Sequence, residues 1–136
     1  MNAAPLKMAD TAARVTVQNI VGFGGSAPPV PDPDKSLLGG KGLGLQEMSS
    51  IGIDVPPGFT LTTKLCQEYQ ETGDISEEVW EGIREAIGRI ERDMGRKFGD
   101  ADSPLLLSCR SGAAVSMPGM MDTVLNVVRA ACLVWI

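Results

Sequence analysis

The sequence has 136 residues, enough for one domain, or part of a larger one, with a modest core. Its hydrophobic content of 43% and charged content of 21% are typical of a globular protein and not of a disordered chain. The formal net charge of -5 argues against a nucleic-acid partner, because phosphate contacts need clustered Lys and Arg. No apolar run approaches the roughly 20 residues that cross a bilayer, so no membrane-spanning helix is expected.

The cysteine and histidine content limits the chemistry. The three cysteines, Cys66, Cys109 and Cys132, have no metal-type spacing and are odd in number, which favours buried, reduced thiols. The chain has no histidine. It therefore lacks the commonest general base near neutral pH and cannot carry a phosphohistidine.

The first half of the chain predicts short elements separated by glycine and proline. A strand is expected at 14–21 and a loop at 22–34, which holds several glycines and prolines. A short helix is expected at 43–50, with Leu45 and Met48 on one face and Gln46 and Glu47 toward solvent. A turn at 51–58 and a half-buried strand at 59–63 complete this half.

A long amphipathic helix is the strongest signal in the second half. After a helical turn or two at 64–71 ending at Gly73, apolar residues recur at spacings of three and four. They are Val79, Ile83, Ile87, Ile90, Met94 and Phe98. Asp74 or Ser76 can cap the helix start, Gly95 and Gly99 can end it, and Glu85 and Arg89 are expected to pair on its outer face.

The last predicted element is a continuous apolar run at 104–110, which fits a buried central strand. The order strand, helix, strand, helix, strand indicates an α/β or α+β fold.

The segment Gly39-Gly-Lys-Gly-Leu-Gly44 is a candidate phosphate loop. Glycines let the backbone approach a ligand, the following helix offers free N–H groups, and Lys41 adds a positive charge. The segment fits neither a Walker A loop nor a complete dinucleotide fingerprint, however. The alternative is a tight turn with a solvated lysine.

Arg110 is the second candidate, because it ends the predicted strand and ligands commonly bind at such strand ends. A guanidinium there could hold phosphate oxygens bidentately, or it could pair with one of the many acidic side chains.

The stretch from Ala113 to Asn126 could line a nucleotide. Its methionines could form an adaptable apolar surface or simply fill the core. Asp122 and Thr123 could coordinate a metal through water or cap a helix.

Three blocks together strongly resemble the beginning of the pyruvate, phosphate dikinase family. They are Lys35-Ser-Leu-Leu-Gly-Gly-Lys-Gly42, Val55-Pro-Pro-Gly-Phe-Thr60 and Ser108-Cys-Arg-Ser-Gly-Ala-Ala-Val-Ser-Met-Pro-Gly-Met-Met-Asp-Thr-Val-Leu-Asn126. The blocks occur in the family's order and at about its spacing. Phosphoenolpyruvate synthases and glucan, water dikinases share the general plan, but Ser-Met-Pro-Gly-Met-Met-Asp-Thr looks like the dikinase form.

This resemblance implies the amino-terminal part of an ATP-grasp-type domain that binds ATP with Mg²⁺. Lys41 and Arg110 match the family's phosphate-binding lysine and arginine. The loop with Met117, Gly119 and Met121 resembles the one over the nucleotide, while Asp122 and Thr123 are loop or Mg²⁺-linked candidates.

In the family, ATP, pyruvate and phosphate give AMP, phosphoenolpyruvate and diphosphate through a phosphohistidine. Full-length relatives imply a homo-oligomer and a cytoplasmic or plastid location.

The likeness spans residues 15–126. Residues 1–14 are expected to be a disordered extension, and 127–136 a tail outside the family. The Mg²⁺-holding carboxylates, the histidine domain and the pyruvate barrel lie beyond this region in the family, so the chain alone is expected to be inactive. The alternatives are a non-catalytic binding or regulatory module, or a fragment of a related phosphoenolpyruvate synthase.

Overall fold

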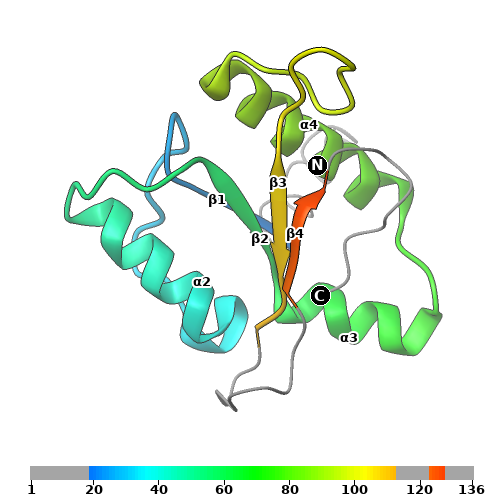
Figure 1. The fold of residues 1–136 in the computed structure, drawn as a ribbon. Helices are drawn as coiled ribbons and strands as arrows, with labels where there is room; N and C mark the ends of the chain where they lie inside the picture. Colours follow the sequence, from blue (N-terminus) through cyan, green and yellow to red (C-terminus); the bar gives the residue numbers. More distant parts are fainter. Residues whose placement is uncertain (1–18, 113–122, 128–136) are drawn as a thin grey trace, which may run out of the picture.

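A computed structural model of the chain describes residues 19–112 and 123–127. In these ranges the elements are β1 Ile20–Phe23, α2 Lys35–Ser50, β2 Gly58–Leu61, α3 Thr63–Thr72, α4 Glu77–Met94, β3 Leu107–Arg110 and β4 Thr123–Val127 (Figure 1). The strands form two antiparallel pairs, β1–β2 and β3–β4. The mixed α and β class expected from the sequence is confirmed. No helix within these ranges is long and apolar enough to cross a membrane.

The β1–β2 pair lies between two helical layers (Figure 1). Successive side chains of a strand point to opposite faces of a sheet. On one face, Phe59 and Leu61 pack with Ile20 against a core formed by α3 and α4, whose buried members are Leu65, Val79 and Ile83. On the other face, Thr60 lies against Gly42 of α2. The short pair is thus covered on both sides.

Helix α2 begins earlier than predicted and contains most of the expected phosphate loop. Asp34 caps it by accepting a hydrogen bond from the backbone N–H of Ser36 at 2.8 Å. The helix breaks only at Gly39, where φ is 69° and ψ is 173°. The prediction of a loop over 39–44 is therefore wrong beyond Gly39. At Gly42 a Cβ would lie 3.2 Å from Oγ1 of Thr60, so this glycine permits close packing on the sheet and does not form a loop.

The prediction that Gln46 faces solvent is also wrong. Gln46 is 2% exposed, whereas Met48 is 38% exposed. The buried face of α2 is formed by Leu38, Gly42 and Gln46, which recur every four residues and so share one side of the helix. The amide of Gln46 is buried because backbone groups of β1 and the following loop satisfy its hydrogen bonds.

Helices α3 and α4 follow the sequence pattern closely at their ends. α3 ends at Gly73, whose φ of 73° is the left-handed conformation of a glycine cap. The Ser76 side chain caps α4 by accepting a hydrogen bond from Val79 N–H, and Gly95 ends the helix at φ 64°. Phe98 consequently lies beyond α4 and not on its apolar face. The helix ends at Met94 because the next residue, Gly95, adopts the left-handed conformation that caps it.

The predicted outer-face pair of Glu85 and Arg89 does not form. Arg89 turns toward the sheet, where its Nη2 donates a hydrogen bond to the carbonyl oxygen of Gly58 at 2.7 Å. On the exposed side of α4, an ion pair joins Arg84 to Glu77 at 2.8 Å, and both side chains are well exposed. The guanidinium of Arg89 therefore binds a half-buried backbone carbonyl of β2 in place of the exposed carboxylate of Glu85.

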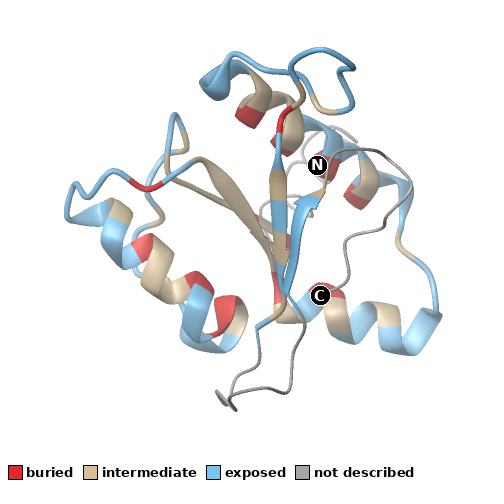
Figure 2. Cartoon of the chain, in the orientation of Figure 1, coloured by how far each residue is buried: buried red, intermediate tan, exposed pale blue. Residues whose placement is uncertain are grey.

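Strand β3 is shorter and less buried than the central strand predicted at 104–110. Within the described residues β4 is its only partner strand, and the burial of β3 alternates between half-buried and exposed. Leu105, just before the strand, is buried at 2% exposure, but Leu106 is 53% exposed. Figure 2 shows β4 exposed along most of its length. A two-stranded hairpin has no second layer to bury both faces, so the apolar run does not form a buried core strand.

The remaining predictions concern the loops and the first strand. A strand was predicted at 14–21, of which only residues 19–21 are described. The observed strand β1 spans Ile20–Phe23, so it extends two residues beyond the predicted end. The segments 24–34 and 51–57 form turns, bends and irregular loops, as predicted, and contain no helix or strand. β2 begins one residue before the predicted strand and ends at Leu61.

Candidate functional site

Lys41 lies in α2, two residues after the break at Gly39. Its side chain is exposed, and its Nζ donates a hydrogen bond to the carbonyl oxygen of Ser111 at 3.1 Å. Seventy positions separate these two residues in the sequence. The contact therefore brings the glycine-containing part of α2 to the end of the β3–β4 hairpin.

Arg110 is the last residue of β3 and lies opposite Thr123, the first residue of β4. Both residues are exposed. Within the described ranges the Arg110 guanidinium forms no hydrogen bond or ion pair, so the acidic partner considered as its alternative role is not seen there. Arg110 lies at the end of the hairpin where β3 leads into the connection to β4.

Three candidate residues are thus gathered around one connection, the one that leads from β3 to β4. Lys41 contacts Ser111, which follows Arg110 directly, and Thr123 pairs with Arg110 across the strands. The other four candidates, Met117, Gly119, Met121 and Asp122, belong to this same connection in sequence but lie outside the described residues. Sequence reasoning did not identify Ser111, because its contribution is a backbone carbonyl, which no residue pattern reveals.

No cluster of metal ligands accompanies Lys41 and Arg110 among the described residues. In the part of the chain that the structure describes, no group of three or more His, Cys, Asp or Glu side chains could hold a metal ion. Thr123 offers a single hydroxyl at an exposed position. The described residues therefore suit an anion better than a bare metal ion.

Among the described residues, the shifted pKa values belong to carboxylates that cap or close local structure. The side-chain and backbone hydrogen bonds of Ser36 hold the pKa of Asp34 below its usual value. The backbone N–H and side chain of Ser26 lower the pKa of Asp93, with smaller help from Arg89 and Arg92. Backbone N–H groups also lower the pKa of Glu78 and of Asp100. The hydrogen bonds behind these shifts stabilise turns and helix starts, and none of them involves Lys41 or Arg110.

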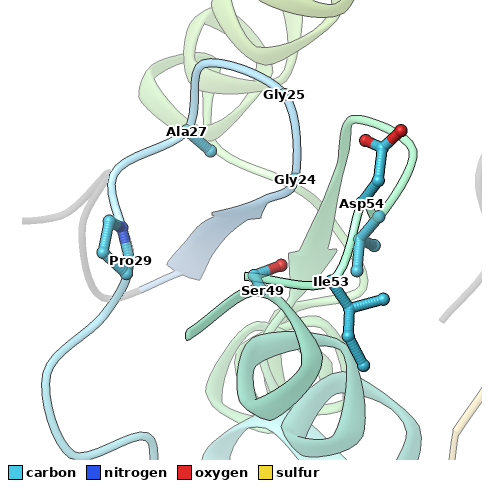
Figure 3. Close-up of a pocket in the computed structure, with 8 residues that line it drawn as sticks. Gly24, Gly25, Ala27, Pro29, Ser49, Ile53 and Asp54 are labelled. Carbon is cyan, nitrogen blue, oxygen red and sulfur yellow. The ribbon is translucent and has the colours of Figure 1, made fainter. Parts of the chain in front are cut away.

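A small cavity of about 180 Å³ opens elsewhere, between the loop after β1 and the end of α2 (Figure 3). Its lining residues are Gly24, Gly25, Ala27, Pro29, Ser49, Ile53, Asp54 and Val55. It contains none of the candidate residues and is smaller than the roughly 300 Å³ at which ligand pockets begin. The hydrogen bond from Ser26 N–H to Asp93 at 3.0 Å holds the adjoining loop on α4.

Comparison with known proteins finds sequence similarity to one family. Residues 35–86 match the sequence model of the family described as "Pyruvate phosphate dikinase, AMP/ATP-binding domain". This stretch contains the whole of α2, including Lys41, and continues into α4. Residues 35–86 belong to that domain family. The resemblance inferred from the three sequence blocks is confirmed.

Plant relatives extend the similarity over most of the chain. It is 64% identical over 93 residues to "Pyruvate, phosphate dikinase, chloroplastic" of Mesembryanthemum crystallinum, covering 68% of this chain and 10% of the relative. It is 52% identical over 120 residues to "Pyruvate, phosphate dikinase 1, chloroplastic" of Arabidopsis thaliana, covering 88% and 12%. It is 50% identical over 123 residues to "Pyruvate, phosphate dikinase 2" of Oryza sativa subsp. japonica, covering 90% and 14%. The chain therefore spans only 10–14% of the length of these relatives.

Proposed function

We propose that this chain forms one wall of an ATP-phosphate site in an ATP-grasp-type domain. Lys41 and Arg110 would bind phosphate oxygens, and the connection with Met117, Gly119 and Met121 would lie over the nucleotide. The observation that supports this most directly is the 3.1 Å hydrogen bond from Lys41 to Ser111, because it brings the lysine next to the segment that carries Arg110. The match to an AMP/ATP-binding domain family supports the choice of ligand.

The two side chains have complementary ways of binding an anion. An ammonium group has three donors, of which Ser111 takes one, so donors remain for phosphate oxygens. A guanidinium presents a planar fork that can bind two oxygens at once. Positive groups fixed where negative charge accumulates supply most of the protein's contribution to phosphoryl transfer.

Magnesium would enter this site on the phosphates of ATP. Asp122 and Thr123 follow the nucleotide-facing segment in sequence and are the residues that could meet the ion or its water. The described residues hold no metal-ligand cluster, so the ion would not be bound by this wall alone.

The complete dikinase reaction would need more protein than this chain supplies. The family reaction passes through a phosphohistidine, and the chain contains no histidine. We therefore propose that the isolated polypeptide binds nucleotide without turnover, and that the activity, homo-oligomerisation and pyruvate site belong to longer family members. The chloroplastic relatives favour a plastid location over a cytoplasmic one.

Calorimetry with ATP, in the presence and absence of Mg²⁺, tests the proposal. Lys41→Met and Arg110→Met should each weaken ATP binding by about 10- to 100-fold, as expected for loss of a charge-assisted hydrogen bond. Lys35→Met, at an exposed lysine of the same helix, and Arg96→Met, at an exposed arginine, are the matched controls. No ATP binding by the wild-type chain, or equal losses in the controls, would overturn the proposal.

A non-catalytic binding module is the second candidate, and the exposed hairpin favours it. Leu106, Val124 and Leu125 are 53%, 51% and 58% exposed on or beside β3 and β4. Exposed apolar side chains on a short hairpin are candidates for a surface that another protein covers. Co-elution of the chain with a full-length dikinase, lost on Val124→Lys and Leu125→Lys substitution, would support this function.

A further inference from the structure

The break in α2 divides the helix into two parts that are held differently. Gly39 has non-helical backbone angles, so the turn before it and the turns after it are separate helical segments. The first segment is fastened by Thr63, whose Oγ1 donates a hydrogen bond to the carbonyl oxygen of Ser36 at 2.8 Å. Lys41 lies in the second segment. The Thr63 contact therefore does not by itself fix the orientation of Lys41.

The second segment is fastened to the sheet by Gln46. Its Nε2 donates a hydrogen bond to the carbonyl oxygen of Gly22 in β1 at 2.6 Å. Its Oε1 accepts a longer hydrogen bond of 3.5 Å from the backbone N–H of Val30, in the loop between β1 and α2. Gln46 therefore joins the second segment of α2 to the strand before it and to the connecting loop.

Burial makes this connection costly to lose. Gln46 is 2% exposed and is among the largest fully buried side chains of the described residues. A buried amide is retained only where its polar atoms have partners, and a buried carbonyl left without a donor destabilises the fold. This segment also contacts the sheet where Gly42 packs on Thr60, and individual van der Waals contacts of this kind are weak.

We propose that Gln46 is a positioning residue for Lys41, holding the ammonium group where it meets the Arg110 segment. This inference rests on the proposed function, in which Lys41 binds ATP phosphates. Gln46 itself touches no ligand in this arrangement. Its hydrogen bond to Gly22 fixes the helical segment only five residues away from Lys41, and the 3.1 Å contact of Lys41 with Ser111 depends on that placement.

A double-mutant cycle on the full chain tests the inference. ATP affinity is measured by calorimetry for the wild type, Gln46→Met, Lys41→Met and the double variant, at a temperature well below each unfolding midpoint. Methionine keeps the unbranched shape of glutamine and removes both hydrogen bonds. Gln67→Met, the same change at an exposed position of α3, is the control.

The expected result is non-additive. Gln46→Met should weaken ATP binding at least fivefold when Lys41 is present and less than twofold when residue 41 is methionine. A residue that merely stabilised the fold would give the same factor in both backgrounds. If Gln46→Met does not fold, Gln46→Asn, which keeps the amide but shortens its reach, enters the same cycle.

The outcomes separate this inference from the proposed function. If Lys41→Met weakens ATP binding and Gln46→Met leaves it within twofold of the wild type, the positioning role is overturned and the phosphate site stands. An equal loss in both backgrounds also overturns the positioning role. If Lys41→Met leaves ATP affinity unchanged, the proposed phosphate site fails, and the role of Gln46 fails with it.

Discussion

Arg89 of α4 and Gly58 of β2 are joined by a 2.7 Å hydrogen bond from the guanidinium to the backbone carbonyl. The same guanidinium occupies the space beside Gly22 of β1, where a Cβ would collide with its Nη1. Gly22 also accepts the hydrogen bond of Gln46 from α2. The short β1–β2 pair is thus tied to α4 and to α2 at neighbouring points, and this ties the helix that carries Lys41 to the main core.

Arg89→Leu should destabilise the chain, because the Gly58 carbonyl loses its guanidinium donor and the leucine cannot replace it. A lost hydrogen bond to a charged group, with its partner left unsatisfied, costs about 1–3 kcal/mol. Chemical denaturation followed by circular dichroism measures this change. Arg84→Leu on the same helix is the control, and its exposed ion pair with Glu77 should contribute less than about 1 kcal/mol. Equal effects of the two substitutions would contradict the role given to Arg89.

Two glycines of α2 should respond to alanine in opposite directions. At Gly42 a Cβ would lie 3.1 Å from Cβ of Leu38 and 3.2 Å from Thr60, so Gly42→Ala should push α2 from the sheet and lower stability. At Gly44 a Cβ would meet nothing within 4 Å. Gly44→Ala should therefore stabilise the helix by about 0.5–1 kcal/mol, because alanine loses less backbone entropy on folding. Thermal unfolding of the two variants checks the sign, and a stabilised Gly42→Ala would refute the close packing.

The sequence predicted elements whose signals are local. The ends of α4 lie at Ser76 and Gly95, one of the two candidates that the sequence offered at each end, because a cap depends on residues within one turn. Gln46 and Arg89 were misplaced for the opposite reason. Both are polar residues in helices, which pattern alone assigns to solvent, and their partners are backbone carbonyls of strands far along the chain.

The sequence nominates the residues of the candidate site, whose role stays a prediction, but it does not give their arrangement. Lys41 and Arg110 stand out by residue type and by their place in the family blocks. Their proximity depends on the carbonyl of Ser111 and on the pairing of Arg110 with Thr123, which only tertiary structure provides. The glycines around Lys41 suggested a loop, because sequence cannot distinguish a glycine that breaks a helix, such as Gly39, from one that lets a helix pack closely, such as Gly42.

Acid should destabilise the fold through Asp93 and the other carboxylates with lowered pKa values. Hydrogen bonds from Ser26 hold the pKa of Asp93 below its usual 3.8, with smaller help from Arg89 and Arg92. The folded-state pKa is lower than the unfolded one, so the stabilisation is fully present above pH 3.8 and is lost as pH falls through the lowered value. Asp93→Asn should lower the unfolding midpoint at pH 7, and this deficit should shrink below pH 3.8.

Melting curves between pH 7 and pH 3 measure the deficit. Glu81→Gln, at an exposed carboxylate of the same helix, is the control and should leave the midpoint close to the wild type at neutral pH. If the unfolding midpoint of Asp93→Asn stayed below that of the wild type by the same amount across this pH range, the charge of Asp93 would not contribute to stability.

Gly39→Ala tests whether the break in α2 is required. At φ 69° and ψ 173°, Gly39 occupies a region that is essentially restricted to glycine, so an alanine there costs about 1–3 kcal/mol. The variant should unfold at a lower temperature and bind ATP more weakly, because relief of the strain would turn Lys41 away from Ser111. Gly40→Ala is the control, since a Cβ at that neighbouring position meets nothing within 4 Å. If Gly39→Ala matched Gly40→Ala in both stability and ATP affinity, the break would have no part in presenting Lys41, and a continuous helix would serve the site equally well.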